Sequence, residues 1–593
     1  MPMTSRHALA VLAWLSALFL GCRPMSIPPL QRPNYPPPEE YLKSPFATGK
    51  PGGHYIQVMM SEPNTFNPLI SEDAASSAAM APLQGTLLRY NPIIEDVEPG
   101  LAKAWTISPC QKRFTFHLRR GVRWSDGAPF TADDVVFTFQ ALYDPRYPNR
   151  KSTEFKINGE PFIIEKHDDY TLTIITPDIF APFLLYVGAG LEILPKHKLE
   201  AAYQDGTLLK TWTVATAQEH PEELVSLGMF RLASYRPGER MIYEANPHFW
   251  MLDEEGTRLP YIDRMIVRFV KDATAAAVAF ATGQTDSAGI TPDNIEWIRK
   301  NEKVHQYTIY DRGPSTASSF IWFNQNPGTN AEGRPFVDPI KRRWFADQRF
   351  RQAISYGINR QGIVEGVLFG RGAPLWGPES PSNRKWYNPN VRQYPYDPAR
   401  SRELLKEAGF TWNSAGELVD SAGHRVAFTL ITNQENPIRQ AMATVFKENM
   451  RHLGIDVRLQ FMDFGSLVNK ISETYDYEAG LLGFTGGGDP HGGMSIYHSS
   501  GRLHQWHPNQ KSPATDWEKR IDWLMEAQLK TLDQAQRKAY YDEVQLIMSE
   551  QLPFIYLVTP NTYFGIKNRW ANVQLPPSTG SPEWNLEAFY LTP

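Results

Sequence analysis

Histidines gather between positions 491 and 507, and they are the residues whose types and spacing could do chemistry most directly. Four of the chain's fourteen histidines lie there, at positions 491, 498, 504 and 507. Imidazole is a common ligand of nickel, copper and zinc. The spacings are irregular and no cysteine joins them, so we interpret the segment as a surface or cleft-rim loop and assign no metal ligands. A metal-binding loop stays the alternative.

Glycine-rich segments and acidic pairs are the other candidates for chemistry. The run Gly486-Gly-Gly488 lacks the Lys-Ser/Thr that follows the glycines of a phosphate-binding loop, so we interpret it as a turn. No G-x-S-x-G or H-E-x-x-H motif occurs, and the pair Asp133-Asp134 fits a helix start. We therefore expect no catalytic residue and no cofactor, with a secreted hydrolase as a remote alternative.

Mixed helix and strand signals surround these segments. Thr131 precedes Asp134 by three residues, a capping-box pattern ahead of the apolar run over 135–139. Asp397-Pro398 predicts a helix start and Gly409 its end. A helix over 437–452, a glycine and an alternating strand over 455–460 follow in the order of an α/β lobe. Two further helices are predicted near 516–529 and 533–550.

Composition excludes several classes of protein. The 60 basic and 64 acidic side chains give a net charge of -4, and no block of five like charges occurs, so nucleic acid is a poor candidate partner. With 42% apolar residues over 593 positions, the chain can bury a large core and form several domains or large lobes.

The N-terminus carries a targeting pattern. Residues 1–22 place a short basic stretch before an apolar run and end in Gly21-Cys22, which predicts a secretory signal. Leu18–Cys22 resembles the bacterial lipoprotein signal, which makes Cys22 the expected lipidation site; a plain cleaved signal or an uncleaved anchor is the alternative. Residues 23–53 contain nine prolines, and we interpret them as a stiff tether or as a disordered N-terminus.

One long motif resembles a known family. The segments Gly100–Trp105 and Phe114–Phe139 look like the signature of the extracellular solute-binding proteins of family 5, the oligopeptide, dipeptide and nickel-chelate receptors of bacterial ABC importers. Asn246–Trp250, Tyr396–Arg400 and Leu404–Gly409 follow in the family's order. The resemblance extends from about residue 54 to 565.

The resemblance implies an α/β fold of the periplasmic-binding-protein type II, with two lobes that close over a ligand by hinge bending. We expect a first lobe over 54–312 and 550–593, which includes an extra subdomain at about 81–190. The second lobe is expected over 313–549.

The resemblance also implies where the ligand lies. In peptide-binding relatives one contact loop corresponds to Ser71–Ala74, although a solvated acidic turn is the alternative. The second corresponds to Leu481–His491, where dipeptide receptors have a Gly-Trp-Thr-Gly-Asp run whose Asp binds the peptide's ammonium group. In this chain Gly487 replaces that Asp, while Asp489 stands two residues later as a substitute or as a structural Asp-Pro. The candidate contacts are Glu72, Asp73, Ala74, Phe323, Trp376, Phe484, Thr485, Gly486, Gly487, Asp489 and Trp506. For the four aromatic residues among them, a place in the hydrophobic core is the alternative.

These features together predict a receptor. We expect a monomeric, lipid-anchored protein of the periplasm or cell surface that binds a peptide or peptide-like solute and delivers it to the permease subunits of an ABC importer. Contact with the membrane would be through the lipid alone. A metal-chelate or oligosaccharide receptor of the same fold is the alternative, as is a sensor that presents its closed form to a signalling partner.

Overall fold

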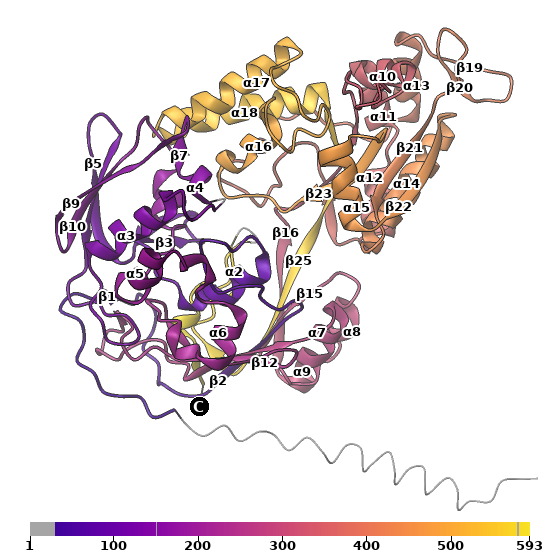
Figure 1. Cartoon of the computed structure of the whole chain (residues 1–593). Coiled ribbons are helices and arrows are strands. Elements are labelled where there is room, and N and C mark those ends of the chain that lie inside the picture. Colours follow the sequence, from indigo (N-terminus) through magenta and orange to yellow (C-terminus); the bar gives the residue numbers. More distant parts are fainter. Residues whose placement is uncertain (1–29, 150, 578–579, 593) are drawn as a thin grey trace, which may run out of the picture.

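The computed structural model describes residues 30–149, 151–577 and 580–592, which form two bodies joined by long strands (Figure 1). The predicted signal peptide and Cys22 lie outside these residues. Among the described helices, none combines the length and the apolar character needed to cross a bilayer. The expected mixed α/β class is confirmed.

The first lobe is built on a four-stranded sheet in the order β11-β12-β14-β2. Its strands are β11 (Phe230–Arg236), β12 (Arg240–Ala245), β14 (Arg264–Phe269) and β2 (His54–Met59). β2 pairs in parallel with β14, and the other pairs are antiparallel. Alternate residues of β12 are buried, so one face of the sheet packs on a core that includes Tyr55 and Tyr243.

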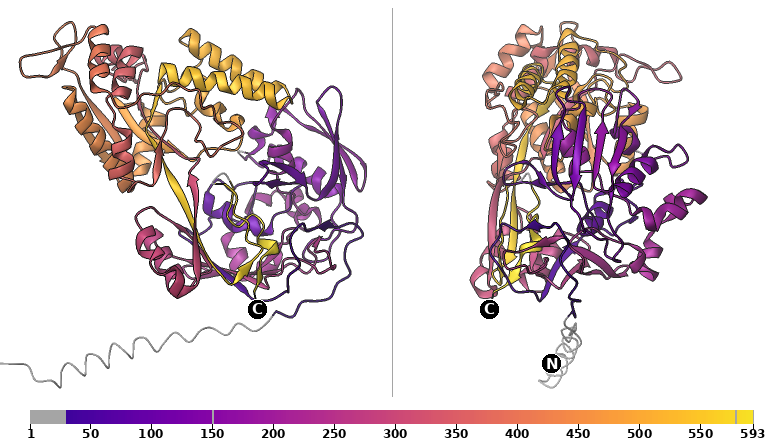
Figure 2. Two further views of the ribbon diagram at one scale, coloured as in Figure 1. Left: turned by 180° about the vertical axis from the view of Figure 1, so that it is seen from behind. Right: turned by 90° about the vertical axis from the view of Figure 1, so that its left-hand side faces the viewer.

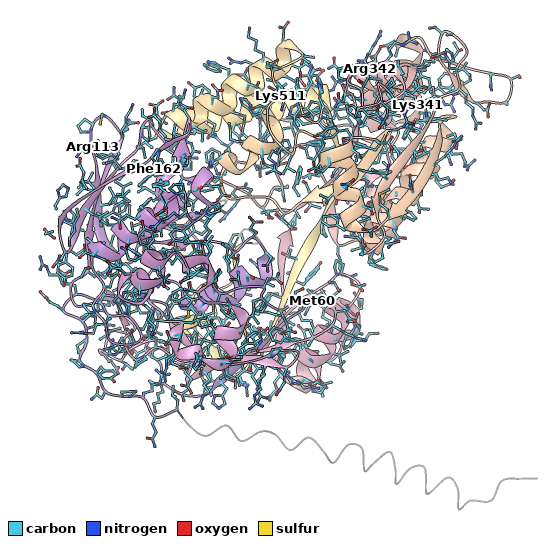
Figure 3. All side chains as sticks on the ribbon, viewed as in Figure 1. Met60, Arg113, Phe162, Lys341, Arg342 and Lys511 are labelled. Atoms are coloured by element: carbon cyan, nitrogen blue, oxygen red, sulfur yellow. The ribbon has the colours of Figure 1, made fainter. Side chains whose placement is uncertain are left out.

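A subdomain extends the first lobe within the predicted range of 81–190. Its sheet has the order β5-β6-β10-β9, formed by β5 (Ala102–Ile107), β6 (Arg113–Leu118), β10 (Thr171–Ile175) and β9 (Ile163–Asp168). The predicted capping box of Thr131 and Asp134 is present at the start of α3 (Ala132–Tyr143). Phe162, labelled in Figure 3, is buried in the core of this subdomain, where its ring lies 6.0 Å from that of Phe183.

The second lobe contains a five-stranded sheet with helices on both faces. Its order is β22 (Asp456–Met462), β21 (Ala427–Asn433), β23 (Ala479–Phe484), β17 (Ser318–Phe323) and β24 (Phe554–Tyr556). One core contains residues of α11 (Gln348–Tyr356), α13 (Pro398–Glu407) and α14 (Pro437–His452), and a second contains residues of α17 (Asp516–Ala527) and α18 (Gln534–Gln551). These helices confirm the predicted segments, including the exact bounds of α14.

The chain crosses twice between the lobes. It leaves along β16 (Tyr307–Pro314) into β17, and it returns from β24 into β25 (Val558–Lys567), which pairs with β16 and with β15 (Ser287–Ile290). From behind, β25 is the long yellow strand between the two bodies (Figure 2). The predicted outward crossing at 313 falls at the end of β16. The predicted return at 550 is too early, because β24 still pairs with β17 in the second lobe.

The described part of the predicted tether is not free of the protein body. Arg32 donates hydrogen bonds to the carboxylate of Asp263 at 2.8 Å and to the carbonyl oxygens of Pro260 and Tyr261. Tyr35 stacks on His248 with ring centroids 4.3 Å apart, and β1 (Leu42–Lys43) pairs with β13 (Met251–Leu252). Residues 30–53 therefore run along the first lobe, which corrects the interpretation of this part as a tether or a disordered end.

We expect Arg32→Ala to loosen this segment without unfolding the lobe. The change removes a charge-assisted hydrogen bond and two bonds to carbonyl oxygens, which together stabilise the contact by about 1–3 kcal/mol. Hydrogen–deuterium exchange should become faster at the amides of Leu42 and Ser44, which donate to the first lobe. Arg236→Ala, at an exposed arginine, is the control. Unchanged exchange at both amides would contradict the docking.

Candidate functional site

A cavity of about 230 Å³ lies where β23 ends in the second lobe. Ser318 and Phe484, which are register partners on β17 and β23, form part of its wall. Glu379, Asp489 and Tyr541 come from three other segments and complete its polar side. The cavity therefore lies at the predicted glycine-rich loop and combines aromatic, carboxyl and main-chain surfaces.

The glycines allow the loop to pass close to neighbouring main chain. Gly486 has a φ of +78°, and a Cβ built on it would lie 2.4 Å from the carbonyl oxygen of Thr316, so a larger residue would clash. Behind the loop, Asn383 donates to the carbonyl of Gly487 at 3.1 Å, and the Trp386 indole donates to the carbonyl of Gly488 at 2.9 Å. The segment Gly486–Gly488 is an irregular loop with a bend at Gly488, and its position is fixed by side chains about 100 residues away.

Asp489 already has a cationic partner in this structure. One of its oxygens lies 2.8 Å from Nη2 of Arg537, and the side chains of both residues are more than nine-tenths buried. The same oxygen accepts a hydrogen bond from the amide of His491, so Asp489 is also the N-cap of the short 3-10 helix Pro490–Gly493. Arg537 in turn lies 5.0 Å from the centre of the Trp386 ring and bonds to Gln528. To bind a ligand's ammonium group, Asp489 would have to share or release Arg537.

The structure brings together some of the predicted contacts. Phe484, Thr485, Gly486, Gly487 and Asp489 all line the cavity. The acidic loop Glu72–Ala74 lies at the start of α2 (Ala74–Met80), where Asp73 accepts hydrogen bonds from the amide and hydroxyl of Ser76 and so acts as the N-cap. This capping role accounts for Asp73 without a ligand.

The predicted aromatic contacts lie mostly elsewhere. Phe323 is 1% exposed and stacks on Phe345 at 4.7 Å within the core of the second lobe. Trp506 is equally buried, and its indole donates to Glu518. Trp376 is half-buried and covers the guanidinium of Arg360 at 4.6 Å. Neither Phe323 nor Trp506 offers a surface to a solute in this conformation, because large aromatic side chains gain most by filling the core.

The subdomain of the first lobe closes one side of this region. The ring of His491 lies 5.2 Å from Phe180 and 5.0 Å from Tyr186, and both contacts are edge to face. The amide of Ala181 also donates to the carbonyl of Leu529 at 2.8 Å. These contacts join the two lobes beside the cavity. Sequence reasoning missed Phe180, Tyr186 and Glu379, because no motif marks them; only the flanking Pro378 and Pro381 set Glu379 apart.

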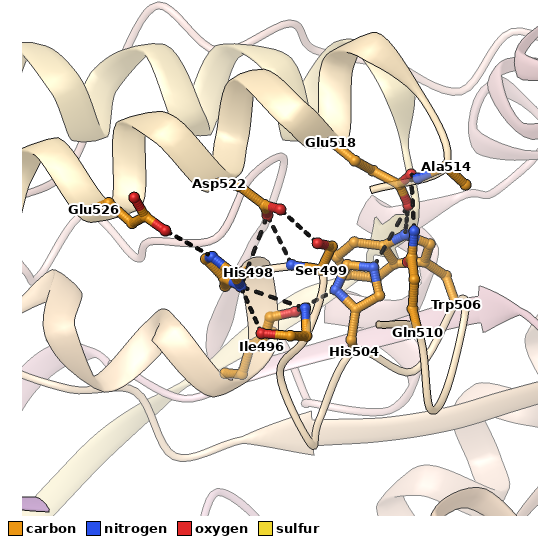
Figure 4. A network of polar contacts seen from close by, with 11 residues as sticks. Ile496, His498, Ser499, His504, Trp506, Gln510, Ala514, Glu518, Asp522 and Glu526 are labelled. Carbon is orange, nitrogen blue, oxygen red and sulfur yellow. Dashed lines mark hydrogen bonds and ion pairs between the residues drawn. The ribbon is translucent and has the colours of Figure 1, made fainter. Parts of the chain in front are cut away.

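His498 and His504 attach their loop to α17 (Figure 4). His498 lies 3.3 Å from Glu526, and the amide of Ser499 donates to Asp522 at 2.7 Å. His504 is fully buried, with Nδ1 3.1 Å from the carbonyl of Ile496 and Nε2 3.5 Å from Glu518. In the part of the chain that the structure describes, no group of three or more His, Cys, Asp or Glu could hold a metal ion.

Glu518 is the acid at the centre of this network. Burial by itself would raise the pKa of Glu518, but the contact with His504 and the hydrogen bonds from Trp506 and Thr515 outweigh it and lower the pKa to about 2. A carboxylate whose pKa is lower in the folded protein stabilises it above the unfolded pKa. That stability is lost as the pH falls through the folded pKa.

We expect Glu518→Gln to reduce stability in a pH-dependent way. A shift from the ordinary value of 4.5 to about 2 corresponds to roughly 3 kcal/mol of stability above pH 5, which disappears toward pH 2. Urea unfolding should therefore show a large difference between the variant and the wild type at pH 6 and a small one at pH 2.5. Glu219→Gln, at an exposed carboxylate at the end of α6 (Val214–Glu219), is the control. A difference that does not change with pH would contradict the assignment.

Comparison with known proteins gives a consistent result. The family model described as bacterial extracellular solute-binding proteins, family 5, middle region, matches residues 96–505. A probable ABC transporter-binding protein of Deinococcus radiodurans is 28% identical over 544 residues, which cover 87% of this chain and 89% of that protein. The oligopeptide-binding protein AppA of Bacillus subtilis is 24% identical over 558 residues, which cover 92% and 93%.

Solved structures agree in fold. The complex of Bacillus subtilis AppA with a nonapeptide matches with a TM-score of 0.69 at 24% identity, over 92% of this chain and all of the other. MelB of Agrobacterium fabrum in complex with stachyose matches with a TM-score of 0.71 at 20% identity, over 94% and 88% of the two chains. Because the family model covers more than half of the sequence, the chain belongs to family 5 of the bacterial extracellular solute-binding proteins, receptors without enzymatic activity that serve ABC importers.

Proposed function

We propose that this protein is a lipid-anchored receptor that binds a peptide or peptide-like solute between its lobes and delivers it to an ABC permease. The observation that carries the proposal is the cavity at the end of β23, whose wall combines the main chain of Gly486 and Gly487 with the ring of Phe484. Peptides are commonly held through main-chain hydrogen bonds while their side chains enter looser pockets. The similarity to the oligopeptide-binding protein AppA and to a dipeptide-binding protein of Escherichia coli supports the same class of ligand.

The size and position of the cavity suit one end of such a ligand. Its volume of about 230 Å³ is below the roughly 300–1,000 Å³ of pockets that enclose a drug-sized molecule. The contacts of His491 with Phe180 and Tyr186 lie beside it and connect the two lobes. A solute bound here would touch groups of the second lobe and favour the arrangement in which the subdomain is docked, which is how a ligand shifts a two-state equilibrium.

The first lobe would face the membrane if Cys22 carries lipid. Among the described residues, Arg32 is the first whose side chain forms several bonds to the protein body, and it lies ten positions after Cys22. Even a fully extended chain of that length spans only about 35 Å. The anchor would therefore hold the first lobe close to the bilayer. The distance would be shorter than if all of residues 23–53 were a free spacer.

A ligand panel tests the proposed class of solute. In thermal unfolding of the chain from residue 23 onward, di- to nonapeptides should raise the melting temperature, and the increase should grow with the logarithm of their concentration. Nickel–histidine complexes and stachyose, which solved relatives hold, are the comparison ligands. If either of these raises the melting temperature while peptides of every length leave it unchanged, the peptide proposal fails. Steady consumption of a ligand would contradict a receptor.

Replacing Cys22 tests the lipid anchor. We expect the wild-type protein to take up labelled fatty acid and to fractionate with membranes, because a lipid adds about 0.8 kcal/mol for each buried methylene group. Cys22→Ser should lose the label and leave the membrane fraction, whereas Cys110→Ser should keep both properties. Membrane association of the Cys22→Ser variant would show that another feature anchors the chain.

A further inference from the structure

Glu379 is a carboxyl group that opens into the cavity and that the predicted contacts do not include. It lies after β18 (Gly372–Pro374), in the segment Pro378-Glu-Ser-Pro381. Tyr541 donates a hydrogen bond to one carboxyl oxygen at 2.6 Å, and Asn383 donates to the other at 2.7 Å. A carboxylate oxygen can accept two hydrogen bonds, so each oxygen keeps one free acceptor position. The two donors hold the carboxyl in one orientation at the cavity wall.

The charges around this carboxyl do not balance. Asp489 lines the same cavity, and Arg537 forms its ion pair with Asp489. The charge of Lys538 lowers the pKa of Glu379 without direct contact, but Lys538 forms its ion pair with Asp542. Within residues 30–149, 151–577 and 580–592, Glu379 has no ion pair with a lysine, arginine or histidine. The cavity wall thus carries two carboxyl groups, and the guanidinium of Arg537, which does not line the cavity, compensates only one of them.

Such an arrangement is unfavourable for the empty protein. Burial raises the pKa of Glu379, the bonds from Tyr541 and Asn383 counter this, and the nearby charge of Asp489 raises it again. Glu379 is half-buried, and a carboxylate withdrawn from water is costly unless a cation compensates it. A neutral side chain of the same size would avoid that cost. Residues that reduce the stability of a protein are typically found at its functional sites. A carboxyl group of this kind in a cavity wall is therefore expected to contact a ligand.

We propose that Glu379 is a specificity-determining residue that binds a protonated amine of the solute, so that the ligands of this receptor are amines. The ammonium group would donate to the free acceptor positions of Glu379 and supply the missing positive charge. Asp489 is the less favourable acceptor, because its buried bond to Arg537 would have to be weakened. The inference rests on the proposed binding of a solute between the lobes. It goes beyond that proposal in stating that the solute carries a positively charged amine.

Matched pairs of free and acetylated amines test the inference with Glu379→Gln. The probes are trialanine, spermidine and the glucosamine trimer, each with its fully N-acetylated form, and calorimetry gives their dissociation constants. In every class that binds, the wild type should prefer the free amine by about 10- to 100-fold, the range of a hydrogen bond between charged groups. Glu379→Gln should bind the two forms about equally.

Two variants and one further readout serve as controls. Glu332→Gln, at an exposed turn, should leave every dissociation constant unchanged. Asp489→Asn should lower the melting temperature through the loss of its ion pair with Arg537, in contrast to Glu379→Gln. Without any ligand, Glu379→Gln should melt at the same or a higher temperature than the wild type, because it removes an uncompensated, half-buried charge. Tyr541 can still donate to the remaining oxygen, and Asn383 keeps its bond to the carbonyl of Gly487.

The outcomes separate this inference from the proposed function. If spermidine or the glucosamine trimer binds and trialanine does not, peptide transport fails while the role of Glu379 stands. If trialanine binds without preference over its acetylated form, peptide binding stands and the role of Glu379 is overturned. A wild type that binds no free amine, or a Glu379→Gln variant that melts several degrees lower, also overturns it.

Discussion

The buried ion pair between Asp489 and Arg537 is the interaction on which the architecture of the binding region depends. It holds the end of the glycine-rich loop against α18, and Trp386 fixes the same loop through a main-chain bond while its ring covers the guanidinium. Removing one partner of such a pair is strongly destabilising, because the other charge stays buried without compensation. The pair therefore serves the loop, and it leaves the carboxyl of Glu379 as the group that faces the cavity without a cation.

A second constraint comes from the two chain crossings. β16 continues into β17, and β24 continues into β25, while β16 and β25 pair with each other (Figure 1). The connection between the lobes is therefore narrow and formed by two neighbouring strands. A connection of this kind allows hinge motion with small changes at a few residues. The contacts of His491 and Leu529 with the subdomain would break if the lobes moved apart. Under the proposed function, binding and closure would be coupled through His491, because it lies in the same loop as Asp489 and Gly492, which line the cavity.

Local patterns predicted much of the fold, and distant contacts decided the rest. The capping box of Thr131, the proline start of α13 and the bounds of α14 follow from residues within a few positions of one another. The docking of Arg32 on Asp263 and the pairing of Asp489 with Arg537 join residues 231 and 48 positions apart, and no local pattern marks them. The loop was therefore predictable as a candidate site, whereas the partner of its acid was not. The same reason explains why Phe323 and Trp506 could not be separated from surface aromatics before their packing was seen.

The most direct test of the account is a crystal structure of the protein with trialanine or another bound solute that carries a free amine. The account predicts the solute between the lobes at the end of β23, with its ammonium nitrogen about 2.7–2.9 Å from a carboxyl oxygen of Glu379 and with the Asp489–Arg537 pair intact. A solute whose amine binds Asp489 while Arg537 is displaced, or one that lies outside the space between the lobes, would contradict it.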